Sequence, residues 1–143
     1  MNPRLRFALA GAVAWLSFPV LSAEPYTPYL DCAASRAHYA VLLRDSKYED
    51  AADLQKVEQS VHSYLRIAVS LAGRDLHEEF RVAANKVQAT EEAIMKKDGA
   101  NAYLQYAEKA HTACAARVAD NQQALLEAME RYEKERLKSE PAR

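Results

Sequence analysis

The sequence predicts an all-α protein, an up-down-up-down four-helix bundle with a charged C-terminal helical extension, joined by one disulfide. The first observation is that residues 29–140 contain no proline, and the only glycines after residue 23 are Gly73 and Gly99. Proline breaks helices and glycine commonly closes them, so these positions divide a nearly continuous helical chain. The second is that apolar residues recur at spacings of three and four, the period of an amphipathic helix.

The start of the chain has the order of a secretory signal peptide, expected over residues 1–23. Two arginines come first, an apolar stretch covers residues 7–20, and Ala23 is the small residue at the expected cleavage point. The alternative is an uncleaved membrane anchor. The apolar stretch, however, is shorter than the roughly 20 residues that span a bilayer, and Pro19 interrupts it. We therefore expect a periplasmic or secreted protein, without membrane insertion after cleavage.

Charge and length restrict the partners and the number of domains. Removing a signal with two arginines from a chain of 19 basic and 20 acidic residues leaves a formal charge of −3. Such a balance does not attract nucleic acid or an anionic membrane, so neither is an expected partner. The remaining chain is long enough for one core. We expect a helical bundle domain over residues 24–119 and a charged helical tail over residues 120–143.

Helix starts and lengths follow from local signals. Ser46 with Glu49, and Asp75 with Glu78, each form a capping-box pattern, in which a polar N-cap residue is followed three positions later by Glu. Short turns between consecutive helices favour antiparallel neighbours. The four helices are expected over residues 30–44, 47–72, 76–97 and from residue 100 onward.

Each of these helices has one apolar stripe that should face the core, and alanines in the first and fourth stripes should let those two helices approach closely. The stripes are Leu30, Ala33, Ala34, Ala37 and Val41 in the first helix; Leu54, Val57, Val61, Tyr64, Leu65, Ala68 and Leu71 in the second; Leu76, Phe80, Ala83, Val87 and Ile94 in the third; and Tyr103, Tyr106, Ala107, Ala110 and Ala113 in the fourth.

The two cysteines, Cys32 and Cys114, are predicted to form a disulfide, because paired cysteines in an exported chain favour a bridge. If the first and fourth helices are antiparallel with these residues opposed, Arg44 lies opposite Ala102, at matching helix ends. Closing a loop of roughly 80 residues contributes about 4.5 kcal/mol in the chain-entropy model. A bridged sulfur is not a nucleophile, which removes thiolate catalysis from consideration.

The last segment permits two interpretations. Residues 120–143 either continue the fourth helix or form a fifth, and they are either a solvated tail or a helix that docks a partner. With the disulfide register above, the segment extends past the first helix, so its apolar strip has little of the bundle to pack against. The candidate partner-binding residues are Leu125, Leu126, Met129 and Tyr132.

Metal and haem sites are not expected. Each histidine follows a core position by one residue, so His38, His62, His77 and His111 are predicted to lie on the rim. Glu108 and His111 give one Glu-x-x-His pair, but di-iron bundles repeat it on a second helix. Neither C-x-x-C-H nor H-E-x-x-H occurs. We therefore predict no metal site and no cofactor.

Catalytic patterns are equally scarce. The chain contains no G-x-S-x-G, phosphate loop or dinucleotide fingerprint. The adjacent carboxylates Glu78–Glu79 and Glu91–Glu92 diverge on a helix, so they cannot jointly flank a substrate and are expected on solvated faces. We therefore predict that the protein is not an enzyme and has no catalytic residues.

Two functions compete on these observations. The first is a non-enzymatic exported protein that acts by binding another protein, of the inhibitor, immunity or stress-factor type, or by self-association. The alternative is a periplasmic small-ligand carrier, which needs a cavity that alanine-rich seams do not favour. The eight tyrosines either pack the core and its rim or line a binding groove.

Overall fold

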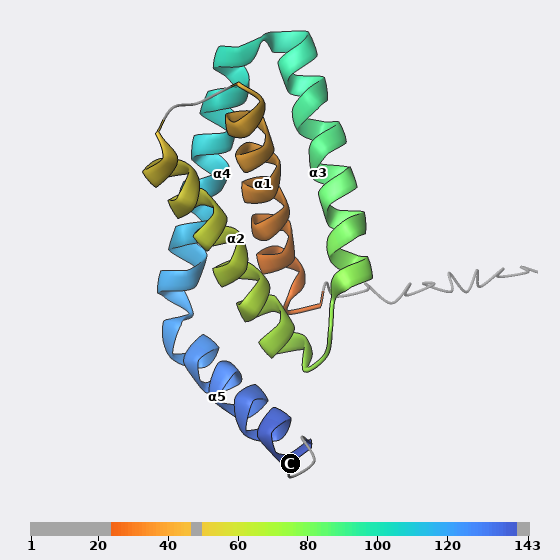
Figure 1. The fold of residues 1–143 in the computed structure, drawn as a ribbon, viewed down its shortest axis with the longest axis vertical. Coiled ribbons are helices and arrows are strands. Elements are labelled where there is room, and N and C mark those ends of the chain that lie inside the picture. Colours follow the sequence, from red (N-terminus) through yellow and green to blue (C-terminus); the bar gives the residue numbers. More distant parts are fainter. Residues whose placement is uncertain (1–23, 47–49, 140–143) are drawn as a thin grey trace, which may run out of the picture.

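The computed structural model describes residues 24–46 and 50–139, which are helical almost throughout and contain no strand. The predicted signal peptide, residues 1–23, lies outside the described residues. The all-α prediction is confirmed. The described residues form five helices: α1 (Thr27–Asp45), α2 (Ala51–Ala72), α3 (His77–Asp98), α4 (Ala100–Asp120) and α5 (Gln122–Ser139) (Figure 1).

Helix ends follow local chemistry, with one difference from the prediction. Gly73, at φ 66°, ends α2 in the left-handed conformation that suits glycine. The Asp75 carboxylate accepts a hydrogen bond from the His77 amide at 2.8 Å at the start of α3, whose N-cap residue is Leu76. The start of α2, however, is later than predicted. Asp50 accepts from the Ala52 and Asp53 amides, whereas the Ser46 hydroxyl donates to the Leu43 carbonyl at the end of α1.

The central helix is α1. It packs against α2, α3 and α4, and within the described residues α2 contacts neither α3 nor α4. Figure 1 shows α1 in the middle, with α3 at one side and α2 and α4 on its two faces. Ala33 and Ala34 are completely buried, and their small side chains allow this close approach from several directions. The four-helix bundle is therefore not confirmed, since a closed bundle would also pack α2 against α3.

The disulfide prediction agrees with the structure. The Cys32 and Cys114 sulfurs are 1.99 Å apart, at disulfide distance, and the two Cα atoms are separated by 5.9 Å. Both residues are buried between α1 and α4. The two helices run in opposite directions in Figure 1, as the cysteine register requires. The pair therefore joins two helices whose cysteines are separated by more than half of the length of the chain.

The C-terminal segment forms a separate helix, and its predicted role as an overhanging apolar strip is wrong for Leu125. α4 ends at Asp120, and the side-chain Nδ2 of Asn121 donates to the Arg117 carbonyl at 2.8 Å. This break redirects α5 so that it packs against α2. Leu125 is 5% exposed and belongs to the main core, against which Met129 also packs.

The outer side of α5 remains open to solvent. Leu126 is 49% exposed and Tyr132 is half-buried, while Arg66 of α2 and Glu133 of α5 form an ion pair at 3.6 Å. Of the predicted strip, therefore, only its outer part is available to a partner. None of the helices within residues 24–46 and 50–139 combines the length and apolar character that crossing a membrane requires.

Candidate functional site

Two polar features stand out, and the first is a buried cluster between α1 and α3. Glu91 of α3 is only 1% exposed, and His38 of α1 is 8% exposed. The His38 Nδ1 atom lies 2.5 Å from Glu91 Oε2, and the Ser35 hydroxyl donates to Glu91 Oε1 at 2.8 Å. Both carboxylate oxygens are thus occupied, as a buried carboxylate requires.

This cluster corrects two predictions. His38 was expected on the rim and Glu91 on a solvated face, but both are buried. The apolar stripe of one helix does not indicate a buried carboxylate, because the hydrogen-bond partners of Glu91 lie on another helix, α1. The other three histidines are exposed, as predicted, and so is Glu92.

Tyr103 of α4 completes the cluster. Its ring meets the His38 ring edge-on at 6.3 Å between centroids. Its hydroxyl is buried near the Glu91 carboxylate, and it forms no hydrogen bond of regular geometry with a described residue. Burial raises the pKa of Tyr103 well above its ordinary value, and the negative charge of nearby Glu91 raises it further. The hydroxyl therefore stays neutral.

The order of the groups does not suit nucleophilic catalysis. In a Ser-His-acid triad the imidazole lies between the hydroxyl and the carboxylate, where it can accept the hydroxyl proton. Here the carboxylate lies between Ser35 and His38. The Ser35 hydroxyl donates directly to the Glu91 carboxylate, and His38 binds the other carboxylate oxygen, so the cluster lacks the order of a triad and connects α1 to α3.

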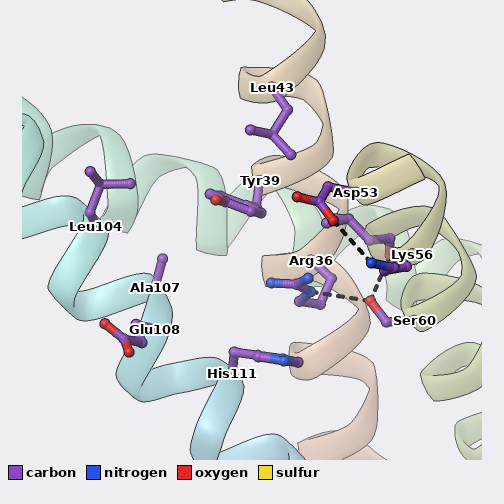
Figure 2. Close-up of a pocket in the computed structure, with 11 residues that line it drawn as sticks. Arg36, Tyr39, Leu43, Asp53, Lys56, Ser60, Leu104, Ala107, Glu108 and His111 are labelled. Carbon is purple, nitrogen blue, oxygen red and sulfur yellow. Dashed lines mark hydrogen bonds and ion pairs between the residues drawn. The ribbon is translucent and has the colours of Figure 1, made fainter. Parts of the chain in front are cut away.

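The second feature is an open groove whose floor is α1 and whose walls are α2 and α4. Because these two walls do not contact each other, a strip of α1 between them stays uncovered. The groove has a volume of about 530 Å³. Its lining residues, most of which are labelled in Figure 2, are Arg36, Tyr39, Leu43, Asp53, Lys56, Val57, Ser60, Leu104, Ala107, Glu108 and His111.

The groove has a polar end and an apolar end. Arg36 and His111 lie at one end in Figure 2, while Leu43 and Leu104 lie toward the other. Leu104, which lines the groove, is 49% exposed. An apolar surface next to fixed polar groups is the composition of a binding site.

Arg36 is held in place from two sides. Its Nε atom donates to the Ser60 hydroxyl at 3.1 Å, and its guanidinium carbon lies 5.2 Å from the centre of the Tyr39 ring. His111 approaches from α4. Partial burial lowers the pKa of the His111 imidazole below its ordinary value, and the positive charge of Arg36 lowers it further. Two groups that repel each other's positive charge thus share one end of the groove.

The predicted site residues lie elsewhere. Leu125, Leu126, Met129 and Tyr132 do not line the groove. The sequence analysis did not identify the groove residues, because they come from three helices and the pattern of one helix does not show which faces meet. A signal was nevertheless present: Arg36, Tyr39 and Leu43 recur on one face of α1 at spacings of three and four. Within the described ranges, no group of three or more His, Cys, Asp or Glu residues could hold a metal ion.

The fold and the groove together define an all-α protein of five described helices, with a disulfide pair and an open groove on its central helix. Comparison with protein-family models, with curated proteins and with solved structures finds no match to this chain.

Proposed function

We propose that the chain is an exported, non-enzymatic helical protein that binds another protein in the groove between α2 and α4. The observation that carries the proposal is the groove itself, which has an anchored arginine on its α1 floor and, toward its other end, an exposed leucine, Leu104, on its α4 wall. Grooves between helices are common docking places for an amphipathic helix, which inserts its apolar face. Inhibitors, immunity proteins and stress factors all act through such contacts.

Export is part of the same proposal. Its support is the charged, apolar and small-residue order of residues 1–23, together with a cysteine pair at disulfide distance. Disulfides persist in oxidising compartments such as the bacterial periplasm. We infer that the protein works there, after cleavage near Ala23.

A small-ligand carrier is the competing function, and the shape of the groove favours a protein partner. Small-molecule sites usually enclose most of the ligand surface. This groove is bounded by two helices that never meet over the floor, so a small molecule in it would remain widely exposed. A helix or loop of a partner protein would itself supply the missing cover.

The test is capture from a periplasmic extract with three forms of the mature protein as bait. Leu104→Glu places a charge in the groove at an exposed position, and Val82→Glu does so on α3, outside the groove, where the valine is 60% exposed. We expect wild type and Val82→Glu to capture the same protein and Leu104→Glu to lose it. The purified captured protein should then bind directly, with the same ranking.

Equal capture by all three forms contradicts the groove as the docking site. Native mass spectrometry of the purified mature protein tests the alternative, because a stoichiometric small molecule that Leu104→Glu abolishes would establish a carrier. Circular dichroism at 222 nm verifies that each variant remains folded.

A further inference from the structure

Arg36 has the geometry of a preorganised anion anchor. A guanidinium carries five N–H donors, and among the described residues Arg36 uses only its Nε donor, in the bond to the Ser60 hydroxyl. The contact of the guanidinium with the face of the Tyr39 ring holds the group from a second side. Within the described residues no carboxylate pairs with Arg36, whereas the neighbouring Lys56 in the groove is paired with Asp53 at 3.1 Å. The Nη donors are left for an external acceptor.

His111 provides a second donor at the same end of the groove. In Figure 2 its ring points from α4 toward α1, in the direction of Arg36. The Glu108 carboxylate, also on α4, is turned away from Arg36 in that view. An anion between the guanidinium and the imidazole would therefore meet two donors, and it would relieve the repulsion that their positive charges exert on each other.

The apolar end has a defined spacing from this pair. Leu43 follows Arg36 by seven residues on α1, and Leu104 precedes His111 by seven on α4. Because the two helices run in opposite directions, the leucines lie together about 10 Å, or two helical turns, from the arginine and histidine. An occupant that fits both ends carries an apolar group and an anion at that separation.

We propose that the occupant is a helix of the partner protein bearing a Glu or Asp side chain two turns from a large apolar residue. Its carboxylate binds between Arg36 and His111, and its apolar side chain packs between Leu43 and Leu104. This inference deepens the proposed function and rests on it. A carboxylate matches the planar fork of arginine, with two parallel hydrogen bonds.

The experiment uses the mature chain and a synthetic probe. The probe is an alanine-based helical peptide, acetylated and amidated, with Leu and Glu seven residues apart; its control has Gln in place of Glu. We expect fluorescence anisotropy to show that the Glu peptide binds at least about ten-fold more tightly than the Gln peptide, which is the discrimination that a charge-assisted bond supplies.

Protein variants locate the anchor. Arg36→Gln should abolish the preference for Glu over Gln, and Arg36→Lys should retain only part of it, because lysine keeps the charge but lacks the fork. Arg81→Gln, a change to an exposed arginine of α3, should keep the preference unchanged. Nuclear magnetic resonance gives an independent readout that a merely structural role would not move: the Glu peptide should raise the pKa of His111 and the Gln peptide should not.

The outcomes separate this inference from the proposed function. Equal affinity of the two peptides, no binding of either, or an unaltered preference in folded Arg36→Gln overturns the carboxylate anchor. If, in addition, Leu104→Glu still loses the captured protein, the docking function stands and the partner chemistry is wrong. If the Glu peptide binds through Arg36 but no protein is captured, the anchor stands and the proposed function fails.

Discussion

At the scale of single residues, Glu91 is the most deeply buried polar side chain among the residues that the structure describes. Its carboxylate is almost completely buried and holds both Ser35 and His38 of the central helix. Removing such a group leaves its former partners buried without a hydrogen bond. The free energy of unfolding then falls by more than the net contribution of the bonds themselves. Its neighbour Glu92 is exposed and lies one step around the same helix.

We therefore expect Glu91→Ala to lower the free energy of unfolding by about 2–4 kcal/mol, because His38 and the Ser35 hydroxyl lose their acceptor. Glu92→Ala is the matched control, and a surface change of this kind should stay within about 0.5 kcal/mol. Urea unfolding followed by circular dichroism measures both. Similar losses for the two variants would mean that the cluster contributes nothing beyond helix propensity.

Tyr103 gives the opposite expectation. Since its buried hydroxyl forms no hydrogen bond of regular geometry with a described residue, and lies near the Glu91 carboxylate, Tyr103→Phe should leave stability at pH 7 unchanged or raise it by up to about 1 kcal/mol. The exposed Tyr106→Phe serves as a surface control. A clear loss of stability in Tyr103→Phe would contradict this expectation and show that the hydroxyl is held by the Glu91 carboxylate.

The raised pKa of Tyr103 also predicts that the stability of the protein depends on pH. The pKa of Tyr103 is raised in the folded state, so above pH 10 the unfolded chain loses this proton first and stability falls as pH rises. Tyr103→Phe should reduce that fall, though Tyr29 and Tyr64, whose pKa values burial also raises, retain their share. Unfolding curves at pH 8 and pH 11 provide the comparison, and parallel falls in wild type and variant would contradict it.

At the scale of elements, α5 shows how a short break changes the role of a helix. Continued straight from α4, its apolar residues would have extended past the bundle. The turn at Asn121 brings the helix against α2 instead, and Leu125 enters the core. The sequence offered both possibilities, because one apolar strip can face a partner protein or the same chain.

We expect Leu125→Ala to lower stability by about 2–4 kcal/mol, as for other buried leucines, since it leaves a cavity in the core. Leu126→Ala should change stability by less than about 0.5 kcal/mol, because this neighbour is half exposed. Thermal and urea unfolding of the pair decide the point. If Leu126→Ala costs as much as Leu125→Ala, α5 packs with a different face.

At the scale of the whole molecule, features that depend on local signals could be predicted from the sequence, and features that depend on contacts between distant helices could not. Helix content, the glycine ends of α2 and α3, and the cysteine pairing follow from signals that are local or involve just two residues. The burial of His38 with Glu91, the turn of α5 and the groove depend on which faces of different helices meet. A stripe of apolar residues on one helix indicates burial but not the partner, and this is why the central position of α1 was not foreseen.

The cysteine pair yields a prediction for the whole chain. Because it closes a long loop between α1 and α4, reduction or the double change Cys32→Ser/Cys114→Ser should cost about 2–4 kcal/mol and lower the thermal midpoint. Peptide mapping without reductant should recover the two cysteine peptides as one linked species. Maleimide labelling of both thiols in the native protein would contradict the bridge.

The central position of α1 also dictates how the molecule can open. In the described chain α3 packs against α1 and α4, and α5 packs against α2 and α4. We therefore expect that either of these outer helices can detach while the remaining helices keep a shared core. Release of α1, in contrast, removes the contacts of three helices at once. Amide protons of α1 should therefore exchange with solvent only through global unfolding, whereas those of α3 and α5 should exchange through smaller, more frequent openings. If so, the groove floor belongs to the slowest-exchanging part of the described chain, and a partner binds to a surface that needs little ordering.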